Sequence, residues 1–268
     1  MSEGRDRRQS LQSLERGIAV IQVFSREHPA LTLSDVARLT GLTRATCRRI
    51  LLTLEKLGHV RSDGRNFSLT PRVLTLGWAY LASLNLSELA QPLMEDLVER
   101  TKESCSAATL DPPDIVYVAR VPTRRIMTVT LGVGARLPAH ATSMGRVLLA
   151  GLSDDELERF LDETPLERLT DNTITDAGEL RAAVLEARVQ GWALVDQELE
   201  IGLRSVAAPV TKAPCGTVAA INVSAAAQRV SLDEFRERFL PDLLETAASI
   251  SAAAGHARAG RWPGGEGR

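Results

Sequence analysis

Arginine and hydroxyl side chains gather in one short stretch of the chain. Arg44 and Arg48 lie one helical turn apart, beside Thr46 and Arg49. A guanidinium donates paired hydrogen bonds to a phosphate or to the O6 and N7 atoms of guanine, so this spacing suits a polyanion. A solvated helix face would carry the same charges, since charge runs are usually only that. The elements around the stretch decide between the two interpretations.

The stretch is predicted to open the second of two helices joined by a tight turn. Thr32 and Asp35 have the spacing of a capping box at the start of the first helix, and Gly41 supplies the turn. Thr43 caps the second helix, whose apolar positions repeat at helical spacing and are expected to face a core: Cys47, Ile50, Leu54 and Leu57. This layout is typical of a helix-turn-helix whose second helix enters the DNA major groove.

Two short alternating runs follow within residues 59–69, joined around Asp63-Gly64. They predict a hairpin, which makes a winged helix-turn-helix with Arg65 and Asn66 at the wing tip. A further helix is expected before the motif, over residues 14–25. The residues predicted to contact DNA are Arg16, Thr32, Thr43, Arg44, Ala45, Thr46, Arg48, Arg49, Arg61, Arg65 and Asn66.

The charges of the chain are unevenly divided. The 268 residues carry a net charge of −2, but residues 1–72 hold 13 Lys and Arg against 7 Asp and Glu, a net of +6. The remainder holds 19 basic and 27 acidic residues, a net of −8. Such asymmetry is expected when one part of a chain meets nucleic acid and the other does not.

The cysteines and the apolar runs indicate the compartment. Cys47, Cys105 and Cys215 are odd in number and far apart, which indicates neither a disulfide framework nor a zinc site. The polar, Arg-rich start lacks the apolar core of a signal peptide, and the longest apolar runs are too short to span a membrane. We therefore expect a cytoplasmic protein with no metal, no cofactor and no membrane partner.

The chain is predicted to divide into a DNA-binding domain at 11–72, a linker helix at 73–85, a second domain at 86–254 and a disordered tail at 255–268. The linker is rich in large apolar residues. It is expected to pack against a second copy of itself, with packing under its own second domain as the alternative.

The second domain is predicted to be α+β. Strands are expected at 107–110, 115–121, 126–133, 193–196, 205–210 and 217–224. Between and around them come helices capped by Ser153, Asp176 and Ser231, the last group broken at Pro241. Turn signals separate the strands, as in an antiparallel sheet covered by helices.

The residues of the second domain favour a binding pocket over catalysis. The four histidines are scattered, and the sequence contains neither a G-x-S-x-G elbow nor a P-loop, so we expect no enzyme. Arg120, Arg125 and Arg204 lie among polar residues at strand ends, and bidentate arginine pairing holds a small carboxylate. The helix that starts at residues 142–145 offers free N–H groups to an anion.

Several motifs carry a family resemblance. Ser-Leu-Glu-Arg-Gly at 13–17, the helix-turn-helix, and the segments 137–150, 191–205 and 219–224 resemble the IclR family of bacterial transcriptional regulators. The likeness runs from about residue 11 to residue 252. Segments 120–127 and 142–146 resemble the branch that regulates the β-ketoadipate pathway of aromatic catabolism, the PcaR, PcaU and PobR group.

The resemblance implies a winged helix-turn-helix joined by a linker helix to a GAF-like effector-binding domain. It implies a homodimer or homotetramer on palindromic promoter DNA. It also implies a pocket for a small carboxylate, either an aromatic acid or a β-ketoadipate-like dicarboxylate. Met144 and Asn222 depart from simpler keto-acid binders of the family, which points to a different ligand. The predicted effector-binding residues are Arg120, Arg125, Met127, His140, Ser143, Met144, Asp196, Arg204, Ser205, Asn222 and Ser224.

The sequence thus predicts a ligand-responsive regulator of an aromatic-acid catabolic operon. Two alternatives stay open. One is a regulator of this family that controls another catabolic operon. The other is an architectural DNA-binding protein whose second domain only forms oligomers.

Overall fold

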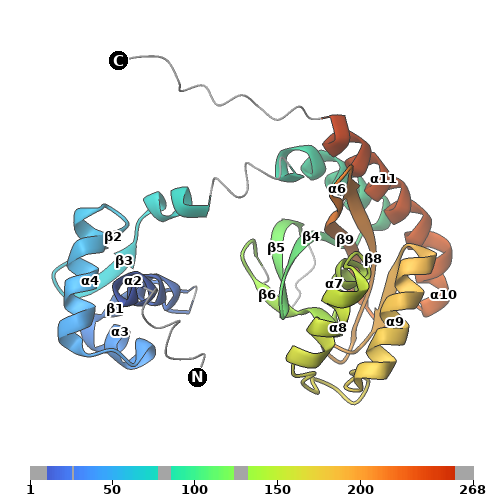
Figure 1. The fold of residues 1–268 in the computed structure, drawn as a ribbon. Helices are drawn as coiled ribbons and strands as arrows, with labels where there is room; N and C mark the ends of the chain where they lie inside the picture. The colour runs from blue at the N-terminus through green and yellow to red at the C-terminus, as the bar shows by residue number, and fades with distance from the viewer. Residues whose placement is uncertain (1–10, 26, 78–85, 124–131, 257–268) are drawn as a thin grey trace. The chain divides into compact units, whose positions relative to one another are not determined.

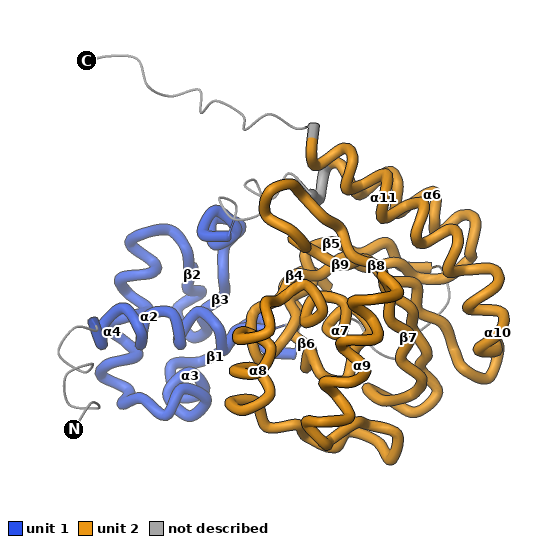
Figure 2. The backbone as a smooth tube through the Cα atoms, turned by 45° about the vertical axis from the view of Figure 1, so that its right-hand side comes forward, with its two compact units in different colours: residues 1–80 blue, residues 81–268 orange. Residues whose placement is uncertain are grey.

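The computed structural model describes residues 11–25, 27–77, 86–123 and 132–256 (Figure 1). The chain divides into two compact units, residues 1–80 and 81–268 (Figure 2). The first unit has one hydrophobic core, and the second has two, one on each face of its sheet.

Within described residues 11–25 and 27–70, three helices and a small sheet form the first unit. The helices are α2 (Gln12–Gln22), α3 (Leu33–Thr40) and α4 (Arg44–Lys56). The strands are β1 (Leu31–Thr32), β2 (Val60–Ser62) and β3 (Asn66–Leu69), in the order β1-β3-β2 with antiparallel pairing. This arrangement confirms the predicted winged helix-turn-helix.

Local capping fixes both helices of the motif. The N–H of Asp35 donates to Thr32 Oγ1 at 3.2 Å, while the N–H of Thr32 donates to the Asp35 carboxylate at 3.1 Å. The Thr32 hydroxyl and then the N–H of Thr32, which both donate to the Asp35 carboxylate, hold the pKa of Asp35 below its ordinary value. Gly41 adopts the left-handed region at φ +67°, and Thr43 accepts from the N–H of Thr46. The predicted caps and turn are confirmed.

Two details of the predicted helices are wrong. Leu57 was expected to face the core, but it is 53% exposed because α4 ends at Lys56. Leu51, one turn after Cys47, was not predicted to face the core and is fully buried there. The first helix begins at Gln12 and ends at Gln22, earlier than expected.

The chain leaves the wing through a 3₁₀ turn, η1 (Pro71–Leu74), and stays helical to residue 77. Residues 78–85, the larger part of the predicted linker helix, lie outside the described residues. Residues 257–268, nearly all of the predicted tail, lie outside them as well.

A six-stranded antiparallel sheet organises the second unit, in the order β6-β5-β4-β9-β8-β7. Its strands are β4 (Ser104–Asp111), β5 (Asp114–Val121), β6 (Arg136–Pro138), β7 (Ala193–Asp196), β8 (Leu203–Lys212) and β9 (Gly216–Ala226). The short strand β6 was not predicted, and most of the strand predicted at 126–133 lies outside the described residues.

Helices cover both faces of this sheet (Figure 1). One face packs against α6 (Leu86–Thr101) and α11 (Leu240–His256). The other packs against α7 (Ser143–Ala150), α8 (Asp154–Glu163) and α9 (Ala177–Gln190). A 3₁₀ turn, η2 (Ala139–Ala141), leads into α7 and brings its first turn onto the sheet.

The predicted caps Ser153, Asp176 and Ser231 are confirmed, since each side chain accepts a first-turn N–H. The predicted break at Pro241 is wrong. The chain runs through α10 (Leu232–Glu234) and a π-helical turn, η3 (Phe235–Phe239), directly into α11. The ring of Pro241 fixes φ at a helical value, and the π-helical turn before it relaxes the usual α-helical hydrogen-bond register.

Candidate functional site

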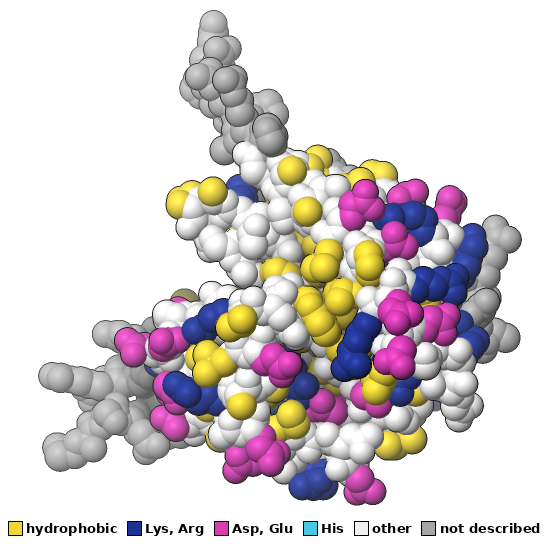
Figure 3. Space-filling view, turned by 90° about the vertical axis from the view of Figure 1, so that its right-hand side faces the viewer, with side chains coloured by type: hydrophobic (Ala, Val, Ile, Leu, Met, Phe, Trp, Pro, Cys, Tyr) yellow, Lys and Arg dark blue, Asp and Glu magenta, His cyan; other side chains and the backbone are white. Residues whose placement is uncertain are grey.

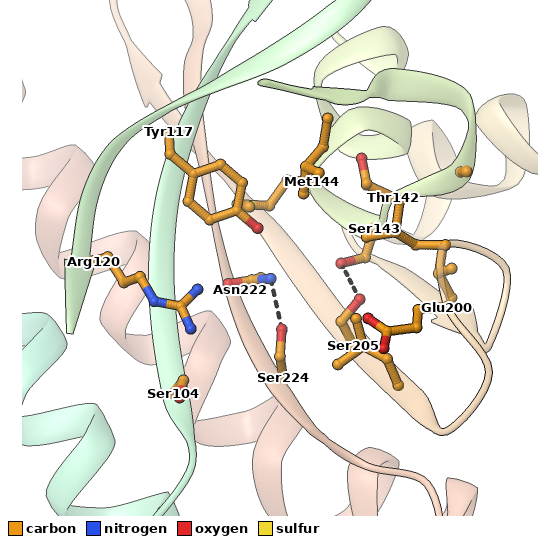
Figure 4. Close-up of a pocket in the computed structure, with 15 residues that line it drawn as sticks. Ser104, Tyr117, Arg120, Thr142, Ser143, Met144, Glu200, Ser205, Asn222 and Ser224 are labelled. Atoms are coloured by element: carbon orange, nitrogen blue, oxygen red, sulfur yellow. Dashed lines mark hydrogen bonds between the residues drawn. The ribbon is translucent and has the colours of Figure 1, made fainter. Parts of the chain in front are cut away.

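A cavity of about 230 Å³ lies between the sheet and the first turn of α7 (Figure 4). The sheet supplies polar side chains from β4, β5, β8 and β9, and the segment between β7 and β8 closes one side. The lining residues are Ser104, Tyr117, Arg120, Leu137, Ala141, Thr142, Ser143, Met144, Val195, Leu199, Glu200, Leu203, Ser205, Asn222 and Ser224. The volume falls just below the usual range for ligand pockets, roughly 300–1,000 Å³, and suits a small metabolite.

One end of the cavity is rich in hydrogen-bond donors. Asn222 has its amide orientation set by two bonds: its Oδ1 accepts from the N–H of Ser106 at 3.0 Å, and its Nδ2 donates to Ser224 Oγ at 2.9 Å. The second amide proton of Asn222 and the hydroxyl proton of Ser224 stay available.

Arg120 brings a positive charge to the same end. Figure 4 shows its guanidinium directed toward Asn222 and Ser224. Within the described residues its guanidinium makes one hydrogen bond, a long one of 3.4 Å to Ser106 Oγ, and no carboxylate there forms an ion pair with it. An unpaired guanidinium beside neutral donors has the chemistry to hold a carboxylate.

The other wall is the start of α7. Ser143 Oγ and Ser205 Oγ lie 2.8 Å apart and join α7 to β8. Thr142 caps the helix by accepting from the N–H of Gly145 at 3.1 Å. The backbone of α7 passes close to Ala139 at Gly145. Only glycine fits there, because a Cβ at this position would lie 2.0 Å from the carbonyl oxygen of Ala139.

Tyr117 and Glu200 complete the polar lining. Burial raises the pKa of Tyr117 to about 12, with Arg120 acting in the opposite direction, so the phenol stays protonated at neutral pH. Its hydroxyl points into the cavity, beside Met144 (Figure 4). Glu200 is exposed and places a carboxylate near Ser205 at the far side from Arg120.

Six of the eleven predicted effector residues line the cavity: Arg120, Ser143, Met144, Ser205, Asn222 and Ser224. Three others are absent from the lining because they have protein partners. The buried His140 contacts the carbonyl oxygen of Glu167 through Nε2 at 3.0 Å. Asp196 and Arg204 pair with each other at 2.7 Å. Arg125 and Met127 lie outside the described residues.

Sequence reasoning missed several lining residues. Thr142 stood inside the recognised motif, so its helix-cap position was a usable signal. Tyr117 and Ser104 carry no such signal, since strand alternation does not tell which face of the sheet bears a cavity.

The predicted DNA-contacting residues lie on α2, at the N-cap of α3, at the start of α4 and on the wing. Arg44, Ala45, Arg48 and Arg49 are exposed on α4, and Arg61 and Arg65 are exposed on the wing. Arg65 follows Gly64, which adopts φ +94° in the hairpin turn. The Thr32 hydroxyl donates to Asp35 at 2.6 Å, the Thr43 and Thr46 hydroxyls bond each other at 2.9 Å, and Asn66 donates to Asp63 at 3.2 Å.

A groove of about 330 Å³ between α2 and α4 brings three of these residues together. Arg16 from α2 lines it with Thr46 and Arg49 from α4. The two arginines place positive charge beside the exposed face of α4.

The surface of the second unit drawn in Figure 3 mixes acidic and basic side chains around exposed apolar ones. Ion pairs in the second unit include Arg100 with Asp242 and Arg238 with Glu234. This face therefore lacks the uniform positive charge that a DNA surface needs. In the described residues no cluster of His, Cys, Asp or Glu could hold a metal ion, and none of the helices there combines the length and apolar composition needed to cross a membrane.

Two family models cover most of the chain. The IclR helix-turn-helix domain matches residues 13–64, and the bacterial transcriptional regulator IclR C-terminal domain matches residues 78–252. The chain belongs to the IclR family. Members of this family are transcriptional regulators.

Curated relatives and solved structures agree with this assignment. The Pca regulon regulatory protein of Pseudomonas putida is 46% identical over 89% of this chain and 82% of its own length. The p-hydroxybenzoate hydroxylase transcriptional activator of Acinetobacter baylyi is 35% identical over 88% of this chain and 89% of its own. A transcriptional regulator from Rhodococcus sp. RHA1 is 55% identical, with a TM-score of 0.81 over 91% of this chain and 98% of its own.

A further solved structure contains a ligand. An IclR homologue from Microbacterium hydrocarbonoxydans, complexed with 4-hydroxybenzoate, is 26% identical to this chain, with a TM-score of 0.81 over 90% of this chain and 98% of its own.

Proposed function

We propose that this protein is a ligand-responsive regulator of an operon for aromatic-acid catabolism. The first unit binds promoter DNA, and a small carboxylate in the cavity of the second unit changes that binding. The observation that carries the proposal is the unpaired guanidinium of Arg120, set among neutral donors in a small cavity. Relatives that control the Pca regulon and p-hydroxybenzoate hydroxylase support the pathway.

The charges of the cavity suggest how the ligand lies. Its carboxylate accepts from Arg120, Asn222 and Ser224. Its other end faces Tyr117 and the hydroxyls near α7, and Glu200 accepts a hydrogen bond there. A hydroxybenzoate carries one carboxylate and a phenolic donor at opposite ends, which matches this arrangement. A relative of the same fold binds 4-hydroxybenzoate. A β-ketoadipate-like dicarboxylate is the second candidate, and it brings a second negative charge toward Glu200.

On the DNA side, we propose that α4 enters the major groove and reads bases through Arg44 and Arg48. Arg16, Arg49, Arg61 and Arg65 contact phosphates. The exposure of these arginines and the net charge of +6 over residues 1–72 support this assignment.

We also propose that segment 73–85 links the two domains and pairs with its counterpart in a second copy, which gives a homodimer or homotetramer. Two helix-turn-helix units then read a palindromic site. A ligand that binds one arrangement of the dimer better than another changes the spacing of the two α4 helices. A regulator of this kind acts on chromosomal DNA, so we propose the cytoplasm as its compartment and no catalytic activity.

Calorimetry on the full chain with protocatechuate, 4-hydroxybenzoate and β-ketoadipate tests the effector. At least one is expected to bind, and Arg120→Ala is expected to weaken it by about 10- to 150-fold, the equivalent of 1.5–3 kcal/mol for a hydrogen bond to a charged group. Arg136→Ala is the matched control, because Arg136 is exposed and pairs with Asp111 and Asp114. If none of the three ligands binds, the proposed catabolic pathway is contradicted and the protein regulates another operon. If no metabolite raises the melting temperature of the chain, it is an architectural DNA-binding protein whose second domain only forms oligomers.

A further inference from the structure

A buried ion pair lies behind the cavity and takes no part in its lining. Arg146 Nη2 and Glu198 Oε2 are 2.5 Å apart, and the side chains are 7% and 9% exposed. Removing two charges from water costs free energy that their attraction rarely exceeds, so such a pair is weak evidence for stability. Its position suggests another role.

The pair joins the two walls between which the cavity opens. Arg146 lies in α7, one turn after Ser143 and next to the helix start that faces the cavity. Glu198 lies between β7 and β8, directly before Leu199 and Glu200, which line the opposite side. The contact between the two side chains therefore connects the two walls.

The segment that carries Glu198 is held by several hydrogen bonds besides the ion pair. Gln197 has φ +59°, a backbone conformation that residues other than glycine adopt at a cost in free energy. Two threonine hydroxyls hold the backbone: Thr170 donates to the carbonyl of Gln197 and Thr173 to the carbonyl of Glu198, each at 2.7 Å. The Glu198 carboxylate also accepts from the N–H of Ile174 at 3.3 Å.

Arg146 depends on this single partner. Its Nε is buried without a hydrogen-bond partner, and among the described residues the guanidinium donates only through Nη2, to Glu198. Because one nitrogen makes the contact, a lysine at this position keeps both the charge and the donor. Methionine keeps the apolar stem and loses both.

We propose that Arg146 and Glu198 are positioning residues for the effector, and that their ion pair sets the width of the cavity between α7 and the 197–202 segment. The inference rests on the proposed function, since it assumes that the cavity binds a small carboxylate. It adds a pair of residues that never touch the ligand and yet determine its affinity.

Arg146→Met, Glu198→Gln and Arg146→Lys in the full chain test the proposal. The matched control is Arg204→Met, which breaks the neighbouring pair with Asp196 between β7 and β8, where neither residue lines the cavity. Urea denaturation gives stability, and calorimetry with 4-hydroxybenzoate and protocatechuate gives affinity. Arg146→Met and Glu198→Gln are expected to weaken binding at least tenfold, Arg146→Lys to restore most of it, and Arg204→Met to lower stability without this loss.

Wild-type affinity in Arg146→Met or Glu198→Gln, or the same loss of affinity in Arg204→Met, overturns the proposal. If Arg146→Met does not fold, Glu198→Gln and Arg146→Lys carry the comparison. If the wild-type chain binds neither ligand, the proposed effector fails and hydrogen exchange decides the positioning role. Residues 197–202 are then expected to exchange faster in Glu198→Gln than in the wild type, and unchanged protection of this segment rejects the role.

Discussion

Gly145→Ala is expected to damage the cavity from a position that no ligand touches. The added Cβ would lie 2.0 Å from the carbonyl oxygen of Ala139 and 2.5 Å from its Cα, where real Cβ contacts are essentially never below 3.0 Å. Both obstructing atoms belong to the backbone, so no side chain can rotate away. Helix α7 and the η2 turn have to separate by about 1 Å, and Ser143 and Met144 move with the helix.

Overpacking of this kind costs about 1–3 kcal/mol, and the better helix propensity of alanine returns at most about 1 kcal/mol. A net loss of about 1–2 kcal/mol lowers the melting temperature by about 2–8 °C for a protein of this size. Because the start of α7 is displaced, the affinity for 4-hydroxybenzoate is expected to fall about tenfold, which corresponds to about 1.4 kcal/mol.

Thermal denaturation and calorimetry measure the two effects on the same preparation. Gly255→Ala in α11 is the control, because Gly255 is exposed and its added Cβ would meet no heavy atom of the described residues within 4 Å. This variant is expected to keep both melting temperature and affinity. A Gly145→Ala protein that melts and binds as the wild type does would refute the reasoning.

Four further outcomes are expected. Arg44→Ala and Arg48→Ala should each cost about 1–3 kcal/mol of binding free energy on promoter DNA and less on a scrambled duplex, as measured by fluorescence anisotropy. Equal losses on both duplexes would contradict base reading. Arg65→Ala should lower the salt slope of DNA binding by about 0.9 and keep sequence preference, and an unchanged slope would remove its phosphate contact. Tyr117→Phe should cost about 0.5–1.5 kcal/mol of effector affinity in calorimetry, and full affinity would place its hydroxyl outside the contact. Because the folded state lowers the pKa of Asp35, its stabilisation is present at neutral pH and lost as pH falls below about 4. Asp35→Asn should therefore reduce the loss of stability in acid denaturation, and an unchanged acid profile would contradict that account.

Local signals predicted much of the fold. Thr32, Gly41 and Thr43 each act on neighbours within four residues, so their spacing was enough to place the ends of α3 and α4. Leu57 was misplaced because helical periodicity continues past the point where the chain turns at Gly58. Long-range pairing is not local: strand β6 forms only because residues 136–138 meet β5.

The candidate site shows the same division. Ser143 and Asn222 came from motifs and do line the cavity. Asp196 and Arg204 looked equally suitable by residue type, but they face each other across β7 and β8 and satisfy their own charges. Tyr117 was missed because its inward direction follows from the packing of α7 on the sheet. Residue chemistry proposes ligands for a site, and pairing within the fold decides which side chains stay free.

The central claim is that a carboxylate bound at Arg120 changes the affinity of the first unit for promoter DNA. The most direct measurement is the affinity of the full chain for its promoter, titrated by fluorescence anisotropy with and without saturating effector, in wild type and Arg120→Ala. The account predicts that effector shifts the wild-type affinity, and that Arg120→Ala keeps the ligand-free affinity and loses the shift. Equal wild-type affinities with and without a ligand that calorimetry shows to be bound would contradict it.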